Sequence, residues 1–386
     1  MKVGIITYHF HYNYGTMLQA LALQNAIDDL EMKAEIIDFY QPNEKSSMEI
    51  WQIRKGRMAY YISHPQYLIK KGYNYIVLNR NKKYIEYKQK CFDEFYKNSI
   101  QLSEQHYSSS NEIEKNPPIY DIYVVGSDQT WNPYTGGNPD AFYLTFAPKD
   151  KKRVSYAPSV SVQSIDGQQR ERLIKLLSNV EELSCREESG SKLLRSITHR
   201  NVTTVLDPTF LLNKELWKQY SKPVQVPKKY ILQYLIGEKK EHREFIRRLS
   251  EKLRIPVVSI PCVAQDMRAK NTIKIWGGPG EFIFLIENAN IICTDSFHGT
   301  AFSLNFRKSV YSFYKNDSED AKSENSRLNS IYDQFGIEDR IITDLTDIPN
   351  EKEIYINYDL RIETNIQKRL IASKNYLKSI LGVLYD

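Results

Sequence analysis

The sequence predicts an α/β protein with two domains, each built on a parallel β-sheet. Apolar strand-like runs alternate with amphipathic helical stretches along most of the chain, which is the pattern of βαβ units. The 386 residues are enough for roughly two to three domains, and a Pro- and Lys-rich stretch over 222–229 separates two such series. We therefore expect domains over 1–222 and 229–358, followed by a C-terminal helix over 359–386.

The first series predicts the sheet of the first domain. A strand, a polar loop and an amphipathic helix open the chain, and the same alternation resumes near residue 122. The predicted strands are 3–8, 34–39, 122–125, 153–157, 182–185 and 202–206, and the predicted helices are 16–30, 168–177, 187–194 and 214–220.

The second series follows the linker and shows the same βαβ alternation. Its predicted strands are 230–235, 256–260, 291–294 and 309–313, and its predicted helices are 241–253, 280–288 and 299–305. A long helical pattern over 360–384 closes the chain.

The basic excess of the protein is local. The whole chain carries 53 Lys and Arg against 47 Asp and Glu, which is too slight a bias for a dedicated nucleic-acid binder unless the charge is clustered. Residues 51–97 hold eleven Lys and Arg, three acids and eight tyrosines. We predict a basic, Tyr-rich helical insert over about 45–100. The simpler interpretation is solvated helix faces, and the alternative is a patch for anionic lipid or a polyanionic saccharide.

Composition also narrows the class of protein. No apolar run approaches the roughly 18 residues of a membrane-spanning helix, and the N-terminus has no secretory signal pattern. The four cysteines are isolated in the sequence, which fits neither a zinc pattern nor a disulfide framework. We expect a cytoplasmic protein without a metal site.

The strongest candidate for chemistry follows the strand over 291–294. There His298 precedes Gly299 and Thr300 at the start of a helix, so an imidazole lies beside free backbone N–H groups that attract phosphate or carboxylate. The helix N-terminus lowers the pKa of such a histidine and a neighbouring carboxylate such as Asp295 raises it again, which gives a group able to exchange protons near neutral pH. A buried histidine without a functional role is an equally good interpretation of the spacing alone.

Three further loops follow predicted strands, where ligands bind in open α/β sheets. In one, Asp128 and Asn132 could bind hydroxyls and Trp131 could stack on a sugar, although ordinary turn chemistry explains the same residues. Arg186 could grip a carboxylate or phosphate, or pair with the two glutamates that follow it.

The loop over 9–15 is the third of these. Gly15 could let a helix N-terminus approach a ligand, but no Gly-x-Gly-x-x-Gly or P-loop pattern occurs. Ordinary nicotinamide or P-loop nucleotide chemistry is therefore disfavoured. His9 and His11 alternate as on a strand, without a third metal ligand.

Taken together, these loops resemble the polysaccharide pyruvyl transferase family. The matching segments occur in the family's order over about 10–340; they are 13–20, 126–133, 155–157, 185–189, 205–209, 278–282, 294–300, 326–327 and 336–340. The resemblance implies a GT-B-like fold, in which two Rossmann-like domains face each other across a cleft and the C-terminal helix over 359–386 can return to the first domain. It also implies transfer of pyruvate from phosphoenolpyruvate onto two sugar hydroxyls, forming a cyclic ketal.

The resemblance carries residue roles onto this sequence. It implies that Arg186 and the triplet Ser296, Phe297 and His298 contact phosphoenolpyruvate, and that His298 is the acid/base. Many members have Arg-Leu-His at the triplet, so Ser296 stands where an arginine is expected. We expect Arg327, or a basic residue of the loop over 268–274, to replace that arginine.

The complete site prediction has three parts. His298 and Asp128 are the expected catalytic residues. The expected donor-binding residues are Arg186, Ser296, Phe297, Gly299 and Arg327, and the expected acceptor-binding residues are Asn13, Gly15, Trp131 and Asn132.

Two other functions remain open on the sequence. One is a GT-B glycosyltransferase with a nucleotide-sugar donor, and the other is an inactive, saccharide-binding member of the family. For the first-ranked function, phosphoenolpyruvate is a substrate and no cofactor is expected. The expected partner is a saccharide acceptor, lipid-linked or free, of a bacterial exopolysaccharide or capsule. The sequence leaves two further interactions open. One is peripheral contact with the inner face of the membrane through 51–97, and the other is self-association.

Overall fold

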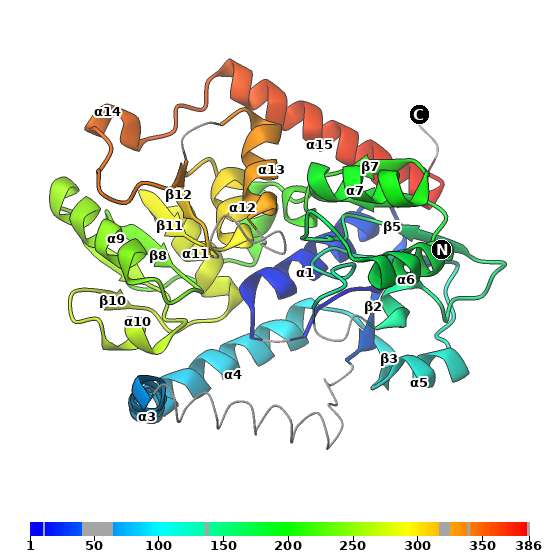
Figure 1. Ribbon diagram of the computed structural model, residues 1–386, viewed down its shortest axis with the longest axis horizontal. Helices are drawn as coiled ribbons and strands as arrows, with labels where there is room; N and C mark the ends of the chain where they lie inside the picture. The colour runs from blue at the N-terminus through cyan, green and yellow to red at the C-terminus, as the bar shows by residue number, and fades with distance from the viewer. Residues whose placement is uncertain (11, 41–64, 136–138, 316–324, 338–339, 384–386) are drawn as a thin grey trace.

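A computed structural model describes residues 1–10, 12–40, 65–135, 139–315, 325–337 and 340–383. The first domain is built on a parallel sheet with the strand order β3-β2-β1-β4-β5 (Figure 1). Its strands are β1 (Lys2–Ile6), β2 (Lys33–Phe39), β3 (Leu102–Tyr107), β4 (Ile122–Val125) and β5 (Lys152–Ser155). The shorter β6 (Leu183–Cys185) and β7 (Val202–Thr204) pair in parallel, and a bridge between Val154 and Glu182 joins them to β5.

Helices cover this sheet and fill the space beside it. They are α1 (Tyr14–Asp28), α5 (Ser110–Lys115), α6 (Gly167–Leu177), α7 (Glu188–Thr198) and α8 (Lys214–Gln219), with short 3₁₀ turns η1 (Asp140–Tyr143) and η2 (Pro208–Phe210). The central helix α1 is buried along most of its length because it packs on β2 and η2 and also touches the second domain through α11 and α12. Its sequence is accordingly apolar on nearly every side.

The second domain repeats the same topology. Its parallel sheet has the order β10-β9-β8-β11-β12-β13. The strands are β8 (Ile231–Tyr234), β9 (Val257–Ser259), β10 (Ile273–Lys274), β11 (Ile291–Thr294), β12 (Ser309–Phe313) and β13 (Ile341–Ile342). The helices are α9 (Lys240–Leu253), α10 (Ala264–Arg268), α11 (Pro279–Asn288), α12 (Phe297–Asn305), α13 (Ser326–Phe335) and α14 (Glu351–Ile354). The predicted fold class, two Rossmann-like α/β domains facing each other as in GT-B proteins, is confirmed.

Several described elements lie outside the predicted pattern, namely β3, β10, β13, α5, α10, α13 and α14, and two of them bear on the argument. β3 is an edge strand whose central residues Glu104, Gln105 and His106 are exposed, so it lacks the apolar alternation of a half-buried strand. α13 begins directly after residues outside the described part of the chain and brings Arg327 to the interface between the domains.

The basic segment forms two helices that connect the domains on one side. α3 (Pro65–Arg80) and α4 (Lys82–Ser99) extend below α1 in Figure 1. The ring of Tyr84 stacks on Trp276 of the second domain with 5.6 Å between centroids, and Lys70 pairs with Glu238 at 2.5 Å. Residues 41–64, which include part of the predicted insert, lie outside the described residues.

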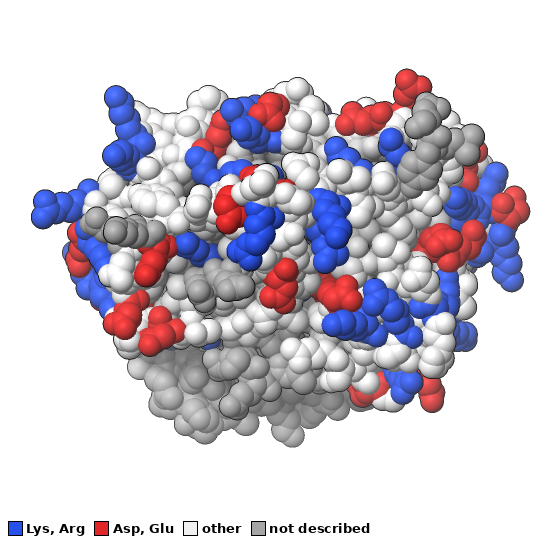
Figure 2. Space-filling view, turned by 90° about the horizontal axis from the view of Figure 1, so that it is seen from above, with Lys and Arg blue, Asp and Glu red and all other residues white. Residues whose placement is uncertain are grey.

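The last helix, α15 (Leu360–Leu381), runs along the top of both domains in Figure 1. Near its start Glu363 pairs with Arg307 of the second domain. Further along, the Ser373 hydroxyl accepts a hydrogen bond from the Leu206 N–H, and the Tyr376 hydroxyl donates to the Ser155 carbonyl. The face formed by α13 and α15 carries interspersed acidic and basic side chains (Figure 2). Among the described helices, none has the length and apolar character needed to cross a membrane.

Tyr14, the first residue of α1, ties the two domains together. Its hydroxyl donates a 2.6 Å hydrogen bond to the carbonyl of Gly277, and its ring stacks on Phe282 with 4.7 Å between centroids. The residue is buried, so the Gly277 carbonyl depends on this hydroxyl as a hydrogen-bond donor.

We expect Tyr14→Phe to lower the free energy of unfolding by about 0.5–1.5 kcal/mol, because one buried hydrogen bond is lost while the ring packing is kept. Urea denaturation measures the change. Tyr355→Phe is the matched control, since that side chain is half exposed and its change is expected to stay within about 0.5 kcal/mol. Equal stability of the Tyr14 variant and the unaltered protein would contradict the interpretation.

Candidate functional site

The candidate site lies where the two sheets reverse their strand order. In the first domain the reversal falls between β1 and β4, and in the second between β8 and β11. Ligands of open α/β sheets bind at the carboxyl ends of the strands at such a switch point. Here α1 follows β1 and α12 follows β11, and these two helices contact each other. The two switch points therefore meet in one place.

His298 lies in the first turn of α12. Ser296 caps this helix, since its hydroxyl accepts a 3.3 Å hydrogen bond from the Gly299 N–H. Gly299 has no room for a side chain, because a Cβ there would lie 2.4 Å from the Thr294 hydroxyl oxygen. The tight junction of strand and helix holds the His298 imidazole, which is 7% exposed, at the domain interface.

Gly15 of the first domain lies directly against that imidazole. A Cβ at this position would lie 2.0 Å from His298 Nδ1, which is closer than any side chain tolerates. The sequence prediction placed Gly15 beside the acceptor, where it would let a helix approach a ligand. In the structure it lets the start of α1 approach the histidine. Asn13 caps the same helix through its side chain and is exposed at the edge of the interface.

A buried carboxylate joins His298 to Arg186. Asp207 Oδ2 lies 3.6 Å from His298 Nε2 and 3.0 Å from Arg186 Nη1. The Ser127 hydroxyl donates to the same oxygen at 3.0 Å, while the backbone N–H and the hydroxyl of Thr209 donate to Oδ1. Asp207 thus connects the carboxyl end of the first sheet to the histidine of the second domain.

Asp207 is absent from the predicted site residues. The sequence contained a usable signal, because Asp207 follows directly after a predicted strand and therefore lies at the same sheet edge as Asp128 and Arg186. Asp295, the predicted partner of His298, has another role. Its carboxylate accepts hydrogen bonds from the N–H groups of Ile236 and Gly237 at 2.6 and 2.8 Å, and so fixes the loop after β8.

The charges around Asp207 keep the carboxylates of the site ionised. Burial by itself would raise the pKa of Asp207, but the His298 imidazole at 3.6 Å and the charge of Arg186 hold that pKa well below its usual range. Burial likewise opposes ionisation of Asp128, whose pKa is nevertheless lowered by Arg186 and His298. Thr16 also donates a 2.9 Å hydrogen bond to Asp128. Both carboxylates are therefore negatively charged near neutral pH.

Arg186 keeps unused hydrogen-bond donors. Its guanidinium group is fully buried, and two of its nitrogens, Nε and Nη2, have no hydrogen-bond partner. The nearest carboxylates to these nitrogens are those of Glu187 at 3.9 Å and Asp128 at 3.6 Å. His298 Nε2 is likewise buried without a hydrogen bond. Buried donors without partners are costly, and an anionic ligand would satisfy them.

Phe297 lies between two guanidinium groups. The guanidinium carbon of Arg186 lies 4.4 Å from the centroid of the Phe297 ring, and that of Arg327 lies 5.9 Å from it. The side chain of Ser296 is occupied by the helix cap. In the loop over 268–274, Arg268 stacks on Tyr73. Of the two expected replacements for the arginine missing at Ser296, Arg327 is thus the one beside the triplet.

Two acceptor predictions are wrong. Trp131 is completely buried, donates from Nε1 to the Phe142 carbonyl and stacks on Tyr143, so its ring cannot receive a sugar. Asn132 is also buried and uses its amide within the local turn, donating to Gln129 and accepting from the Tyr134 N–H. Gly299, predicted to bind the donor, uses its N–H in the helix cap and is required for packing.

Of the two histidines that alternate on the first loop, the structure describes only His9. His9 is buried, and its Nδ1 lies 2.7 Å from the hydroxyl oxygen of Tyr96 on α4, while His11 lies outside the described residues. The described part of the chain contains no group of three or more His, Cys, Asp or Glu side chains arranged to hold a metal ion.

The fold and the site together define an α/β protein of two Rossmann-like domains, with charged groups gathered where the two domains meet. The sequence model of the polysaccharide pyruvyl transferase family matches residues 13–317. That range covers well over half of the chain, and the chain belongs to this family. It is a transferase of polysaccharide biosynthesis.

Several solved structures are similar to this chain at low sequence identity. UDP-GlcNAc 2-epimerase from Methanocaldococcus jannaschii is 13% identical with a TM-score of 0.48, over 97% of this chain and 100% of that one. A putative UDP-N-acetylglucosamine 2-epimerase from Listeria monocytogenes is 9% identical with a TM-score of 0.48, over 99% and 90%. Acinetobacter baumannii MurG is 9% identical with a TM-score of 0.41, over 99% of each chain. No curated protein sequence matches the chain.

We expect Asp207→Asn to lower the free energy of unfolding by about 3–5 kcal/mol at pH 7, because it leaves the buried Arg186 charge without its closest partner. The pKa of Asp207 is lowered in the folded protein. Ionised Asp207 therefore contributes fully to the free energy of unfolding above the ordinary aspartate pKa near 4, and this contribution is lost as the pH falls toward the pKa of Asp207 in the folded protein. The stability difference between the two proteins should therefore shrink below about pH 4.

Urea denaturation at pH 7, 5 and 3 measures this difference. Asp347→Asn is the control, since Asp347 is exposed and its substitution should change stability by less than about 0.5 kcal/mol. A difference for Asp207→Asn that stays constant over the whole pH range would show that the carboxylate charge is not what stabilises the site.

Proposed function

We propose that this protein transfers pyruvate from phosphoenolpyruvate onto two hydroxyls of a saccharide, forming a cyclic ketal and releasing phosphate. The observation that carries the proposal is the shared carboxylate of Asp207, which brings a histidine and an arginine with unused donors together at the domain interface. Membership of the polysaccharide pyruvyl transferase family supports the same reaction.

Donor binding needs positive charge, because phosphoenolpyruvate carries a carboxylate and a phosphate. Arg186 and Arg327 flank Phe297 and are the proposed ligands of these anionic groups. The N-terminus of α12 adds a positive dipole end at His298. Because Ser296 brings no charge, we propose that Arg327 supplies the second cation of the donor site.

The proposed chemistry begins with proton transfer from His298. Its imidazolium gives a proton to the methylene carbon of phosphoenolpyruvate, which becomes a methyl group, and C2 becomes an oxocarbenium-like electrophile. The Asp207 carboxylate balances the positive charge of the imidazolium before the transfer. Burial of His298 keeps bulk water away from the reactive carbon.

Two hydroxyl additions complete the reaction. The first sugar hydroxyl bonds to C2 and gives up its proton, the C2–O bond to phosphate breaks, and the second hydroxyl then bonds to C2. One of the two hydroxyl protons restores His298, and the other leaves with phosphate. Asp128 is the proposed hydroxyl ligand or base, since its ionised carboxylate is only partly buried.

We propose a saccharide acceptor and no cofactor, with phosphoenolpyruvate as a substrate. The described insert helices α3 and α4 span 65–99 and carry eight Lys and Arg against three acids, and several of their large apolar side chains are exposed. Such a surface suits peripheral contact with anionic lipid. We therefore propose a cytoplasmic protein that reaches the inner face of the membrane through this insert.

His298→Ala is expected to lower phosphoenolpyruvate-dependent phosphate release by about 10²- to 10⁴-fold, the usual effect of losing a general acid. Phosphate release with a mixture of saccharide acceptors measures the rate, and circular dichroism checks that the variant is folded. His106→Ala is the matched control, because His106 is an exposed histidine on β3. A fully active His298→Ala protein would rule out the proposed acid.

Donor identity can be tested by thermal unfolding. A ligand that binds only the folded state raises the melting temperature, and the rise grows with the logarithm of the ligand concentration relative to its Kd. Phosphoenolpyruvate should therefore stabilise the unaltered protein and should stabilise Arg327→Gln much less. UDP and GDP should have no such effect. Stabilisation by UDP or GDP instead of phosphoenolpyruvate would favour a nucleotide-sugar donor and contradict the proposal.

A further inference from the structure

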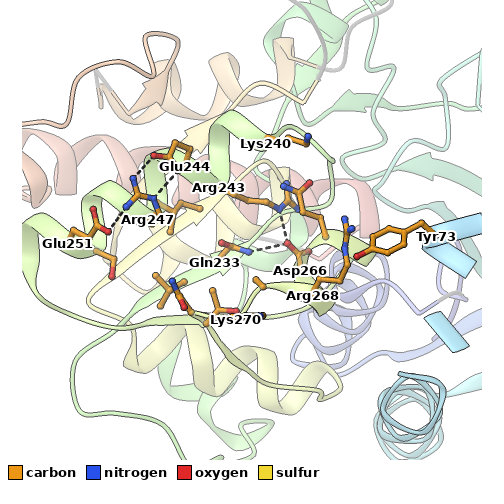
Figure 3. A pocket seen from close by; sticks show the side chains of 17 residues that line it. Tyr73, Gln233, Lys240, Arg243, Glu244, Arg247, Glu251, Asp266, Arg268 and Lys270 are labelled. Carbon is orange, nitrogen blue, oxygen red and sulfur yellow. Dashed lines mark hydrogen bonds and ion pairs between the residues drawn. The ribbon is translucent and has the colours of Figure 1, made fainter. Parts of the chain in front are cut away.

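A large cavity lies in the second domain beside the helix α9. Its volume is about 860 Å³, and its walls come from one face of α9, from α10, from the loop that leads into β10 and from Tyr73 of α3 (Figure 3). This volume falls in the usual range for small-molecule sites. Of the residues predicted for the site at Asp207 and His298, only some of the alternative basic residues of the loop over 268–274 line it.

Cations without acidic partners line this cavity. Arg247 is occupied by Glu244 and Glu251, and Arg243 is occupied on one side by Asp266 at 2.8 Å (Figure 3). The remaining lining cations, which form no ion pair with the described residues, are Lys240, Arg268 and Lys270. The cavity therefore keeps a positive charge after its internal pairs are counted.

Two side chains that line the cavity also have buried donors that lack a partner among the described residues. Arg243 Nη2 and the Thr272 hydroxyl are shielded from solvent and form no hydrogen bond. The other donors of Arg243 are used, since Nε donates to Asp266 and Nη1 donates to the Lys239 carbonyl. The cavity thus offers a guanidinium nitrogen, a hydroxyl and three cations that form no ion pair with the described residues. Groups of this kind bind the oxygen atoms of a phosphate group.

We propose that this cavity is a second anion site, which binds a phosphate or diphosphate ester. Arg243 Nη2 and Thr272 bind the innermost oxygens, and Lys240, Arg268 and Lys270 neutralise the charge at the mouth. The site is separate from the proposed donor site and needs no pyruvyl transfer to operate.

The mouth of the cavity borders an apolar helix face. The guanidinium carbon of Arg268 lies 4.5 Å from the centroid of the Tyr73 ring. Ile69, Tyr73 and Ile76 are exposed and follow one another at helical spacing along α3. An ester held at Arg268 therefore has an apolar surface beside it. A lipid headgroup and a soluble sugar phosphate share the ester chemistry, and the two sources can be separated by experiment.

Calorimetric titration with inorganic diphosphate tests the site. The triple variant Lys240→Gln, Arg268→Gln, Lys270→Gln should bind diphosphate at least about tenfold more weakly than the unaltered protein, because three charge-assisted contacts are removed. The charge-matched control is Lys228→Gln, Lys229→Gln, Lys374→Gln, which changes three exposed lysines elsewhere and should bind as the unaltered protein does. Arg327→Gln changes the proposed donor site and leaves the cavity unaltered. It should therefore keep the diphosphate binding that the triple variant loses.

Equal affinity of the triple variant and the control would overturn the proposal, whatever the pyruvyl transfer assay shows. Conversely, loss of diphosphate binding in the triple variant would support the cavity even if His298→Ala were fully active. Sedimentation with phosphatidylcholine vesicles, with and without phosphatidic acid, then identifies the source. Binding to phosphatidic acid that the triple variant loses and the control keeps indicates a lipid headgroup, and diphosphate binding without vesicle binding indicates a soluble ester.

Discussion

The site depends on one buried carboxylate. Asp207 is fully buried, and it lies within 3.6 Å of both a guanidinium nitrogen of its own domain and an imidazole nitrogen of the other. Removing these charges from water is expensive, and only close pairing and further hydrogen bonds offset the cost. Ser127 and Thr209 supply those hydrogen bonds. The relative position of the two domains at the site is therefore set by an interaction that tolerates little displacement.

The packing around α1 brings the domains close enough for this contact. Gly15 admits the His298 ring at a distance that no side chain would allow, and Tyr14 anchors the start of the same helix to the Gly277 carbonyl. Phe92 of α4 packs on the Tyr14 ring with 4.7 Å between centroids, so the basic insert supports the same junction. Helix packing and charge pairing thus act on the same few residues.

Positive charge is distributed between two places with different neighbours. At the domain interface Arg186 is surrounded by Asp128, Glu187 and Asp207, and a ligand there must compete with fixed carboxylates for its donors. In the cavity beside α9 the outer cations Lys240, Arg268 and Lys270 form no ion pair within the part of the chain that the structure describes, so an anion there meets less competition. The fixed charges at the domain interface suit a reaction in which a small donor is held in one orientation. The cations of the cavity beside α9 suit the binding of an anionic group.

By itself the sequence determined the α/β alternation, the two-domain division of the strands and the loops that carry His298, Asp128 and Arg186, because periodicity and position after a strand are local properties. Only the tertiary structure decided which of these side chains meet. Trp131 became a core residue and Asp295 a loop support, whereas Asp207 became the partner of His298. Such pairings depend on how two domains pack, and packing brings together residues whose separation along the chain carries no signal of contact.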